Sequence, residues 1–154
     1  MIMKTETVEF NVDNLKELLN QFKNVKYEEI LNEESDDSYI RVSFSTKTTE
    51  EYGKVDIVLK AKDNRLLLLV LDVKNISDVE NKFELFEKIL TFNSREILYG
   101  SLGYEAKIDN ITYTNSISID GRQNLAKDEL LDYLAYTIFV VNKIRKNITT
   151  NQWS

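Results

Sequence analysis

Three charged residues, Asp56, Asp72 and Lys74, have the clearest capacity for chemistry in this sequence. Asp56 lies in VDIVLK, where apolar and polar residues alternate, and Asp72-Val73-Lys74 ends the apolar run that follows. This alternation predicts strands, and residues two apart in a strand face the same side of a sheet. Two carboxylates and a lysine on neighbouring strands can hold Mg²⁺ and activate a water molecule. The sequence therefore contains one candidate metal-dependent catalytic site.

This arrangement resembles the D…(D/E)xK signature of the PD-(D/E)xK nucleases, which need neither His nor Cys. The predicted helices before and after the strand pair also fit that resemblance. The signature is short, however, no Pro precedes Asp56, and charged residues are common where strands end. A structural role at the strand ends is the competing interpretation. Under it the protein has no catalytic residues, no metal site and no cofactor.

Other catalytic chemistries are excluded by residues that the chain lacks. The 154 residues include no His and no Cys, which removes thiolate nucleophiles, disulfides and ordinary zinc sites. Ser94, Ser101 and Ser116 have no His partner for a catalytic triad. The acidic segment 32–38 lacks the spacing of a calcium-binding loop, and YGSLGY at 99–104 precedes a strand instead of opening a helix. Glycine in that segment is typical of entry into a sheet.

The charge of the chain bears on its partners and location. Asp and Glu outnumber Lys and Arg by 26 to 20, for a net charge of −6. An acidic protein has no long-range attraction for nucleic acid or for an anionic membrane, so we expect neither as a partner. The first ten residues contain no apolar signal segment, and the run Leu66–Leu71 is too short to span a bilayer. These features predict a cytoplasmic protein.

Hydrophobic periodicity predicts one α+β domain over residues 1–148 and a frayed polar tail at 149–154. Short turns at 63–64 and 109–110 favour a mainly antiparallel sheet with helices packed on it. The apolar run from Leu66 is expected to be covered on both faces. Helices are predicted over 12–23, from Ser77 to near Asn93, and over 125–146. Strands are predicted over 26–31, 40–44, 55–60, 66–73, 102–108 and 111–119, with 120–121 ending the last one. The order is α-β-β-β-(β)-α-β-β-α.

The last predicted helix carries more apolar residues than one core-facing stripe requires. The excess could belong to the core, or it could form a face for a partner or a second copy. The same two interpretations apply to the strand at 40–44. The candidate residues for partner contact are Ile40, Val42, Phe44, Leu134, Ile138 and Val141.

The block from Lys54 to Lys146 resembles the type III secretion chaperone-like fold, and within it the YbjN-type family of bacterial proteins described as sensory transduction regulators. The segments that carry this resemblance are VDIVLKAKDNRLLLLVLDV, LTFN with its Asn93, GYEAKIDNITYTNSISI and DELLDYLAYTIFVVNKI. The resemblance implies an α+β sandwich, a homodimer and no enzymatic activity. It supplies no catalytic residues to carry over.

Together the residues and the resemblance predict a cytoplasmic, non-enzymatic protein-binding module with a chaperone-like or regulatory role. Such a module would bury an apolar segment of its partner on strand and helix surface, with acidic residues setting partner choice. A metal-dependent nuclease using Asp56, Asp72 and Lys74 is one alternative. An acidic immunity or inhibitor protein that neutralises a basic toxin is another.

Overall fold

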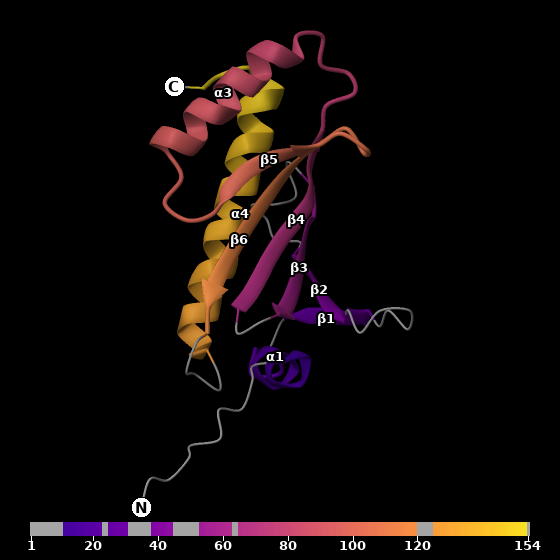
Figure 1. Cartoon of the computed structure of the whole chain (residues 1–154), viewed down its shortest axis with the longest axis vertical. Helices are drawn as coiled ribbons and strands as arrows, with labels where there is room; N and C mark the ends of the chain where they lie inside the picture. The colour runs from indigo at the N-terminus through magenta and orange to yellow at the C-terminus, as the bar shows by residue number, and fades with distance from the viewer. Residues whose placement is uncertain are drawn as a thin grey trace, which may run out of the picture.

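A computed structural model describes residues 11–22, 25–30, 38–44, 53–62, 65–119 and 125–153 of the chain (Figure 1). Within these residues the fold is α+β, in the predicted order, with six antiparallel strands in the sequence β1-β2-β3-β4-β6-β5. The helices are α1 (Val12–Leu19), α3 (Lys82–Arg95) and α4 (Lys127–Thr150). The strands are β1 (Lys26–Ile30), β2 (Tyr39–Phe44), β3 (Val55–Lys62), β4 (Arg65–Asn75), β5 (Ser101–Glu105) and β6 (Asn110–Ser118).

One face of the sheet carries the core. Alternate residues point to it because side chains of a strand change sides at every residue. Leu59 pairs with Leu68 between β3 and β4, and Val70 pairs with Tyr113 between β4 and β6, so these residues share a face. All four are fully buried, together with residues from α1, α3 and α4 in a single cluster. The three helices therefore cover the same face of the sheet.

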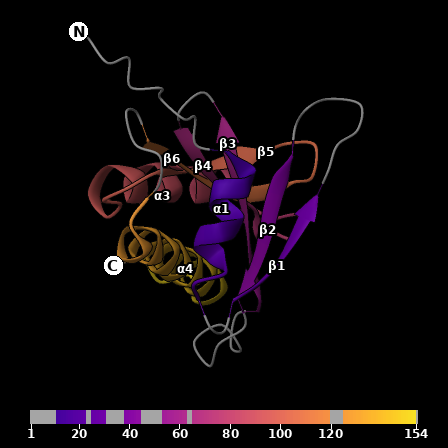
Figure 2. The same ribbon diagram turned by 90° about the horizontal axis from the view of Figure 1, so that it is seen from below.

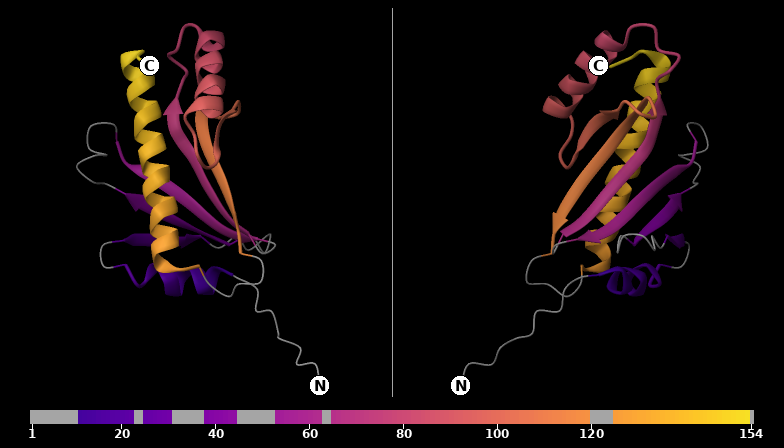
Figure 3. Two further views of the ribbon diagram at one scale, coloured as in Figure 1. Left: turned by 90° about the vertical axis from the view of Figure 1, so that its left-hand side faces the viewer. Right: turned by 45° about the vertical axis from the view of Figure 1, so that its right-hand side comes forward.

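The helices divide that face between them. The long helix α4 crosses the sheet, whereas α3 lies near the β5 end (Figure 3). The short helix α1 packs beside β2 and β3 at the other end, as the view from below shows (Figure 2). The Asn11 side chain caps it by accepting a hydrogen bond from the Asn14 amide at 3.1 Å. No described helix is long and apolar enough to cross a membrane.

The opposite face of the sheet, which we call the open face, has no described helix against it. It carries Val58, Leu67 and Leu69, which are partly buried, and Leu71, which is 49% exposed. The expectation that the run from Leu66 is covered on both faces is therefore wrong for the described part of the chain. An all-apolar run indicates burial but cannot say whether a second layer exists.

Helix α3 begins later and ends later than predicted. Asn81, and not Ser77, is the cap, since its side chain accepts from the Glu84 amide at 3.1 Å. Ser77 instead donates its amide to the side chain of Asn75 at 3.1 Å, in the turn after β4. Asn93 lies inside the helix, which continues to Arg95. The sequence offers two capping patterns in succession, Ser77 with Glu80 and Asn81 with Glu84, and the helix uses the second.

The C-terminal end is also more ordered than predicted. Helix α4 continues to Thr150, and Asn151 ends it in a left-handed conformation with φ of 52°. Trp153 then packs against the core and is partly buried. The prediction of a frayed tail over 149–154 is therefore wrong for residues 149–153. The predicted turns at 63–64 and 120–121 and the acidic segment 32–37 lie outside the described residues.

Candidate functional site

The three candidate catalytic residues do lie together. Asp56, Asp72 and Lys74 line one cleft of about 540 Å³, where β3 begins, β4 ends and the last turns of α4 pass. Asp56 already has partners there, since it accepts a hydrogen bond from Ser43 and lies 3.9 Å from the Lys54 ammonium. The sequence pattern therefore predicted a real spatial cluster, which we call the charged cleft.

Arg145 of α4 holds this cleft together. Its Nε donates to the Val73 carbonyl at 2.6 Å, and its Nη2 donates to the Asp72 carbonyl at 2.7 Å. Its Nη1 donates to the carbonyls of Gly53 and Lys54 at 3.2 and 3.1 Å. The pairing of β4 with β6 shifts register between Val70 and Lys74, and the guanidinium supplies donors to carbonyls in this irregular stretch.

The position of Arg145 also decides what the cleft can bind. The residue is buried, which lowers the pKa of its guanidinium, while the charges of Asp72 and Asp56 oppose that shift. The positive charge of Arg145 repels a divalent metal ion that would approach the same two carboxylates. Within the described residues, no group of three or more metal-ligating side chains occurs. The donor set does not fit a magnesium site, and the geometry supports the structural interpretation of these residues.

The candidate partner-contact residues are divided between two environments. Phe44 and Ile138 are partly buried at the edge of the core. Four others are fully or almost fully buried. They therefore belong to the core, which was one of the two interpretations that the sequence allowed. These four are Ile40, Val42, Leu134 and Val141. These four are therefore not accessible for contact, whereas Phe44 and Ile138 remain partly accessible.

The outer side of α3 presents large apolar side chains to solvent. Phe83 is 74% exposed and Leu90 is 67% exposed. Between them Phe86 is half-buried, and its ring centroid lies 4.9 Å from that of Tyr104 on β5. We call Phe83, Phe86 and Leu90 the α3 stripe. Its spacing of three and four residues places these side chains on one side of the helix.

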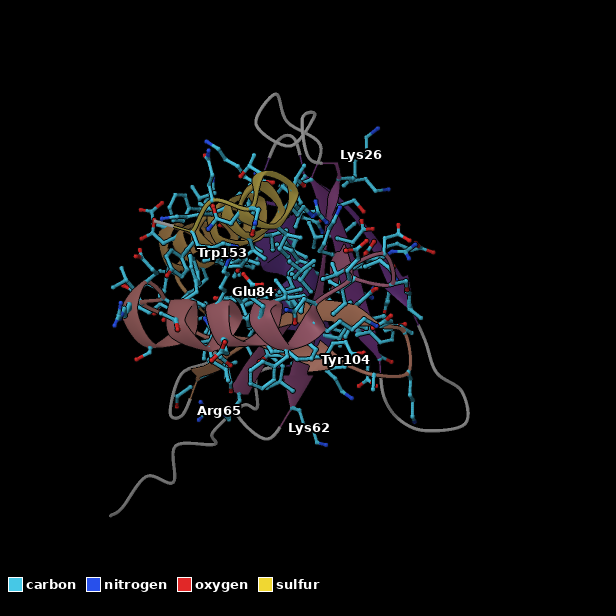
Figure 4. The ribbon with its side chains drawn as sticks, turned by 90° about the horizontal axis from the view of Figure 1, so that it is seen from above. Lys26, Lys62, Arg65, Glu84, Tyr104 and Trp153 are labelled. Atoms are coloured by element: carbon cyan, nitrogen blue, oxygen red, sulfur yellow. The ribbon has the colours of Figure 1, made fainter. Side chains whose placement is uncertain are left out.

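A groove runs along the other side of α3, toward α4. Figure 4 shows Glu84 and Trp153 between these helices, with Tyr104 on the opposite side of α3. The groove has a volume of about 610 Å³, with Phe92 and Trp153 among the residues that line it. Charged residues of α3 and its C-terminal cap surround the two rings: Glu84, Glu87, Lys88, Arg95 and Glu96.

A cluster of aromatic side chains joins α4 to the segment before β5. The Tyr99 ring lies 5.1 Å from Tyr136 and 5.9 Å from Tyr133, both measured between centroids. Tyr113 donates its hydroxyl to the Tyr99 carbonyl at 2.8 Å, which fixes the segment. Gly100 adopts a φ of 73°, and a Cβ there would lie 2.5 Å from the Thr114 carbonyl oxygen. The prediction that glycine marks entry into the sheet is confirmed at this position.

Specific polar contacts hold α3 against the sheet. The Asn93 side chain pairs with both backbone groups of Leu102, donating to its carbonyl at 2.9 Å and accepting from its amide at 2.8 Å. These contacts occupy part of the edge of β5 that another strand would need. At the other end of α3, Lys82 contacts Asp109 at 2.9 Å. Hydrogen bonds from Tyr104 and Lys82 lower the pKa of the Asp109 carboxyl.

The sequence analysis did not predict the α3 stripe, because an apolar residue in a helix does not by itself show which side of the helix packs on the core. The buried positions are Leu85, Ile89 and Phe92, whereas Phe83 and Leu90 lie on another side. At about 100° per residue, Leu90 is about a quarter turn from Ile89. The sequence signal that could have predicted the α3 stripe is therefore the presence of apolar residues on two different sides of this helix.

Comparisons with known proteins give a fold and no family. No protein-family profile matches the sequence, and no curated protein matches it significantly. Among solved structures, the chain is similar to the crystal structure of YbjN from E. coli, described as a "putative transcription regulator". The TM-score is 0.64 at 14% identity, over 96% of this chain and 97% of that one. The fold expected from the sequence resemblance is therefore confirmed.

Proposed function

We propose that this protein is a non-enzymatic protein-binding module that receives an apolar segment of a partner on the α3 stripe. The observation that carries this proposal is the exposure of Phe83 and Leu90 on a helix whose other side is packed in the core. Large apolar side chains that gather on a surface mark contact sites more often than scattered ones do. The similarity to YbjN supports a regulatory or protein-binding role through the fold alone.

The structure supports side-chain contact as the mode of binding. Asn93 occupies backbone groups at the edge of β5, so the adjacent edge is poorly suited to adding a partner strand. A partner helix or turn with apolar residues three or four positions apart matches the spacing of the α3 stripe. Glu87, which also borders the groove toward α4, is exposed one turn after Phe83 and has no ion-pair partner among described residues. It favours a basic residue beside the apolar segment.

The test replaces both exposed residues of the stripe. The double variant F83S/L90S is compared with wild type in quantitative capture of partners from an extract of the source cells. Leu71→Ser is the matched control, because Leu71 is similarly exposed on the open face of the sheet. We expect a partner that wild type and L71S retain equally and that F83S/L90S retains at least about tenfold less. Equal retention by all three proteins contradicts the proposal.

The captured partner also separates the possible roles. A regulatory protein or a client with an apolar segment supports a chaperone-like or regulatory module. A basic toxin would identify the protein as an acidic inhibitor that uses the same surface. In every case purified F83S/L90S must keep the unfolding free energy of wild type. We expect this because substitutions at exposed positions change stability little.

A further inference from the structure

The groove between α3 and α4 has the size of a small-molecule site. Its volume of about 610 Å³ lies within the range of about 300–1,000 Å³ that ligand pockets occupy. An adjoining pocket of about 230 Å³ shares Glu84, Lys88 and Trp153 with it. Figure 4 shows Glu84 and Trp153 at this boundary between the two helices. The chemistry of the lining residues decides which ligand the groove suits.

Trp153 gives the groove an aromatic wall. It follows Asn151, which ends α4 in a left-handed conformation. The Lys88 ammonium donates to the Asn151 side chain at 3.2 Å and lies 3.3 Å from Glu84, so it ties this end of the chain to α3. Trp153 remains partly exposed, whereas Phe92 is almost fully buried. The Trp153 ring is thus the apolar surface available to a ligand in this groove.

Two charged side chains of the groove have no partner within the described part of the chain. The charges that are paired are Glu84 with Lys88, and Glu96 with Lys143 of α4. Glu87 and Arg95 also line the groove, and neither has an ion-pair partner among the described residues. The helix dipole favours a cation at Arg95 in the last turn of α3, but it does not explain a carboxylate at Glu87, the sixth residue.

The two unpaired charges lie on the same side of α3. Glu87 and Arg95 are eight positions apart, so their Cα atoms are separated by about 12 Å along the helix. Thr91 lies midway between them and lines the groove as well. Both charged side chains are long, so their ends can approach to the length of a dipeptide, whose two residues span about 7 Å when extended.

We propose that this groove binds a small zwitterion of about dipeptide length. Its ammonium group pairs with Glu87, its carboxylate pairs with Arg95, and an apolar side chain packs on Trp153. Arginine suits the carboxylate because its guanidinium can donate two parallel hydrogen bonds. The chain already holds one ammonium beside a ring and a carboxylate, since Lys143 lies 5.7 Å from the centroid of Phe92 and 3.7 Å from Glu96.

Fluorescence can follow the binding directly, because Trp153 is the only tryptophan in the chain. The probe is the free dipeptide leucyl-leucine, which has no aromatic ring. We expect a saturable change in Trp153 emission, with a dissociation constant of about 1 mM or below. Isothermal titration calorimetry repeats the titration, so that binding without a change in emission is also detected. No binding by either method at about 10 mM dipeptide overturns the proposal.

Blocked dipeptides test the two pairings separately. N-acetyl-leucyl-leucine lacks the ammonium and leucyl-leucinamide lacks the carboxylate, so each should bind wild type at least about fivefold more weakly. Glu87→Gln should bind leucyl-leucine as weakly as wild type binds the acetylated form, with no further loss on acetylation. Arg95→Met should behave in the same way toward the amide. Equal binding of free and blocked dipeptides by wild type contradicts the proposal, as does an acetylation penalty that E87Q retains.

Glu17→Gln is the matched control for E87Q. Glu17 is an exposed residue of α1 that does not line the groove, and its replacement changes the net charge by the same amount. E17Q should bind leucyl-leucine as wild type does. Free leucine tests the length, since one residue spans about half the distance and should bind at least about fivefold more weakly. A loss in E17Q equal to that in E87Q would reduce the effect to general charge attraction and overturn the site.

The groove and the α3 stripe lie on different sides of α3, although Glu87 borders both. The double variant F83S/L90S leaves every residue that lines the groove intact. It should therefore bind leucyl-leucine as wild type does, even where it loses the partner of the stripe. If F83S/L90S loses the dipeptide, the ligand lies on the stripe and the groove proposal fails. Loss of the captured partner alone concerns only the stripe.

Discussion

The charged cleft and the outer sides of α3 and α4 form an instructive contrast. The cleft gathers Asp56, Asp72 and Lys74, the candidate catalytic residues of the sequence. Its central group, Arg145, is fully engaged by four backbone carbonyls. The outer helix surfaces carry ordinary residues such as Phe83 and Phe139, but these have no partner that covers them.

A buried charge whose hydrogen bonds are all made indicates a role in stability, whereas an uncovered apolar surface indicates a role in binding. A buried guanidinium with matched acceptors stabilises a fold, and removing it leaves acceptors without donors. An exposed apolar ring contributes little to folding and gains free energy only when a partner covers it. We therefore interpret the cleft as structural and propose the outer helix surfaces as the site of function.

The largest effect is expected for Arg145→Met, which keeps an apolar stem but removes every donor. The carbonyls of Gly53, Lys54, Asp72 and Val73 then lose their partner near the start of β3 and the end of β4. We expect a loss of about 3–5 kcal/mol in the free energy of unfolding, measured by urea denaturation. Arg145→Lys keeps the charge without the forked geometry and should lie between Met and wild type.

Arg95→Met is the matched control for this prediction, since Arg95 is an exposed arginine on α3 without an ion-pair partner among described residues. Its unfolding free energy should stay within about 0.5 kcal/mol of wild type. A value for R145M as small as that for R95M would show that the cleft is not structural. The division between cleft and helix surfaces would then fail.

The sequence predicts local elements well and tertiary partners poorly, and particular residues show why. Alternation at Val55, Ile57 and Leu59 correctly indicated a strand with one buried face, because that signal is local. Arg145 gave no such signal, since its acceptors lie 72 to 92 residues away. Asn93 was interpreted as a helix end, whereas its side chain pairs with Leu102 across space.

The candidate sites follow the same rule. The spacing of Asp72 and Lys74 gave the hypothesis of a shared site with Asp56, and the three residues do line one cleft, because strand periodicity fixes which side a residue faces. It could not predict the guanidinium that enters the cleft from α4. Likewise, the apolar excess of α4 was visible in the sequence, but which residues face outward depends on where the helix packs. Leu134 and Val141 are buried, whereas Phe139 is exposed.

An intermediate effect is expected on α3, where one helix offers a matched pair of leucines. Leu85 is 7% exposed and faces the core, whereas Leu90 is 67% exposed in the α3 stripe. Leu85→Ala should lower the free energy of unfolding by about 2–3 kcal/mol, through lost burial and the cavity left behind. Leu90→Ala should change it by less than about 0.5 kcal/mol. Similar losses for both variants would mean that the stripe belongs to the core.

The smallest effect is expected from Mg²⁺ at the charged cleft. A metal site present only in the folded state stabilises it by about 2.7 kcal/mol when the ion is at 100 times its dissociation constant. Because Arg145 already supplies the positive charge beside Asp56 and Asp72, we expect millimolar MgCl₂ to change the unfolding free energy no more than NaCl of equal ionic strength. Asp72→Asn serves as the paired variant, because it removes one carboxylate at nearly constant shape. A magnesium-specific stabilisation that D72N abolishes would return the cleft to the list of functional sites and reverse the contrast between the two regions.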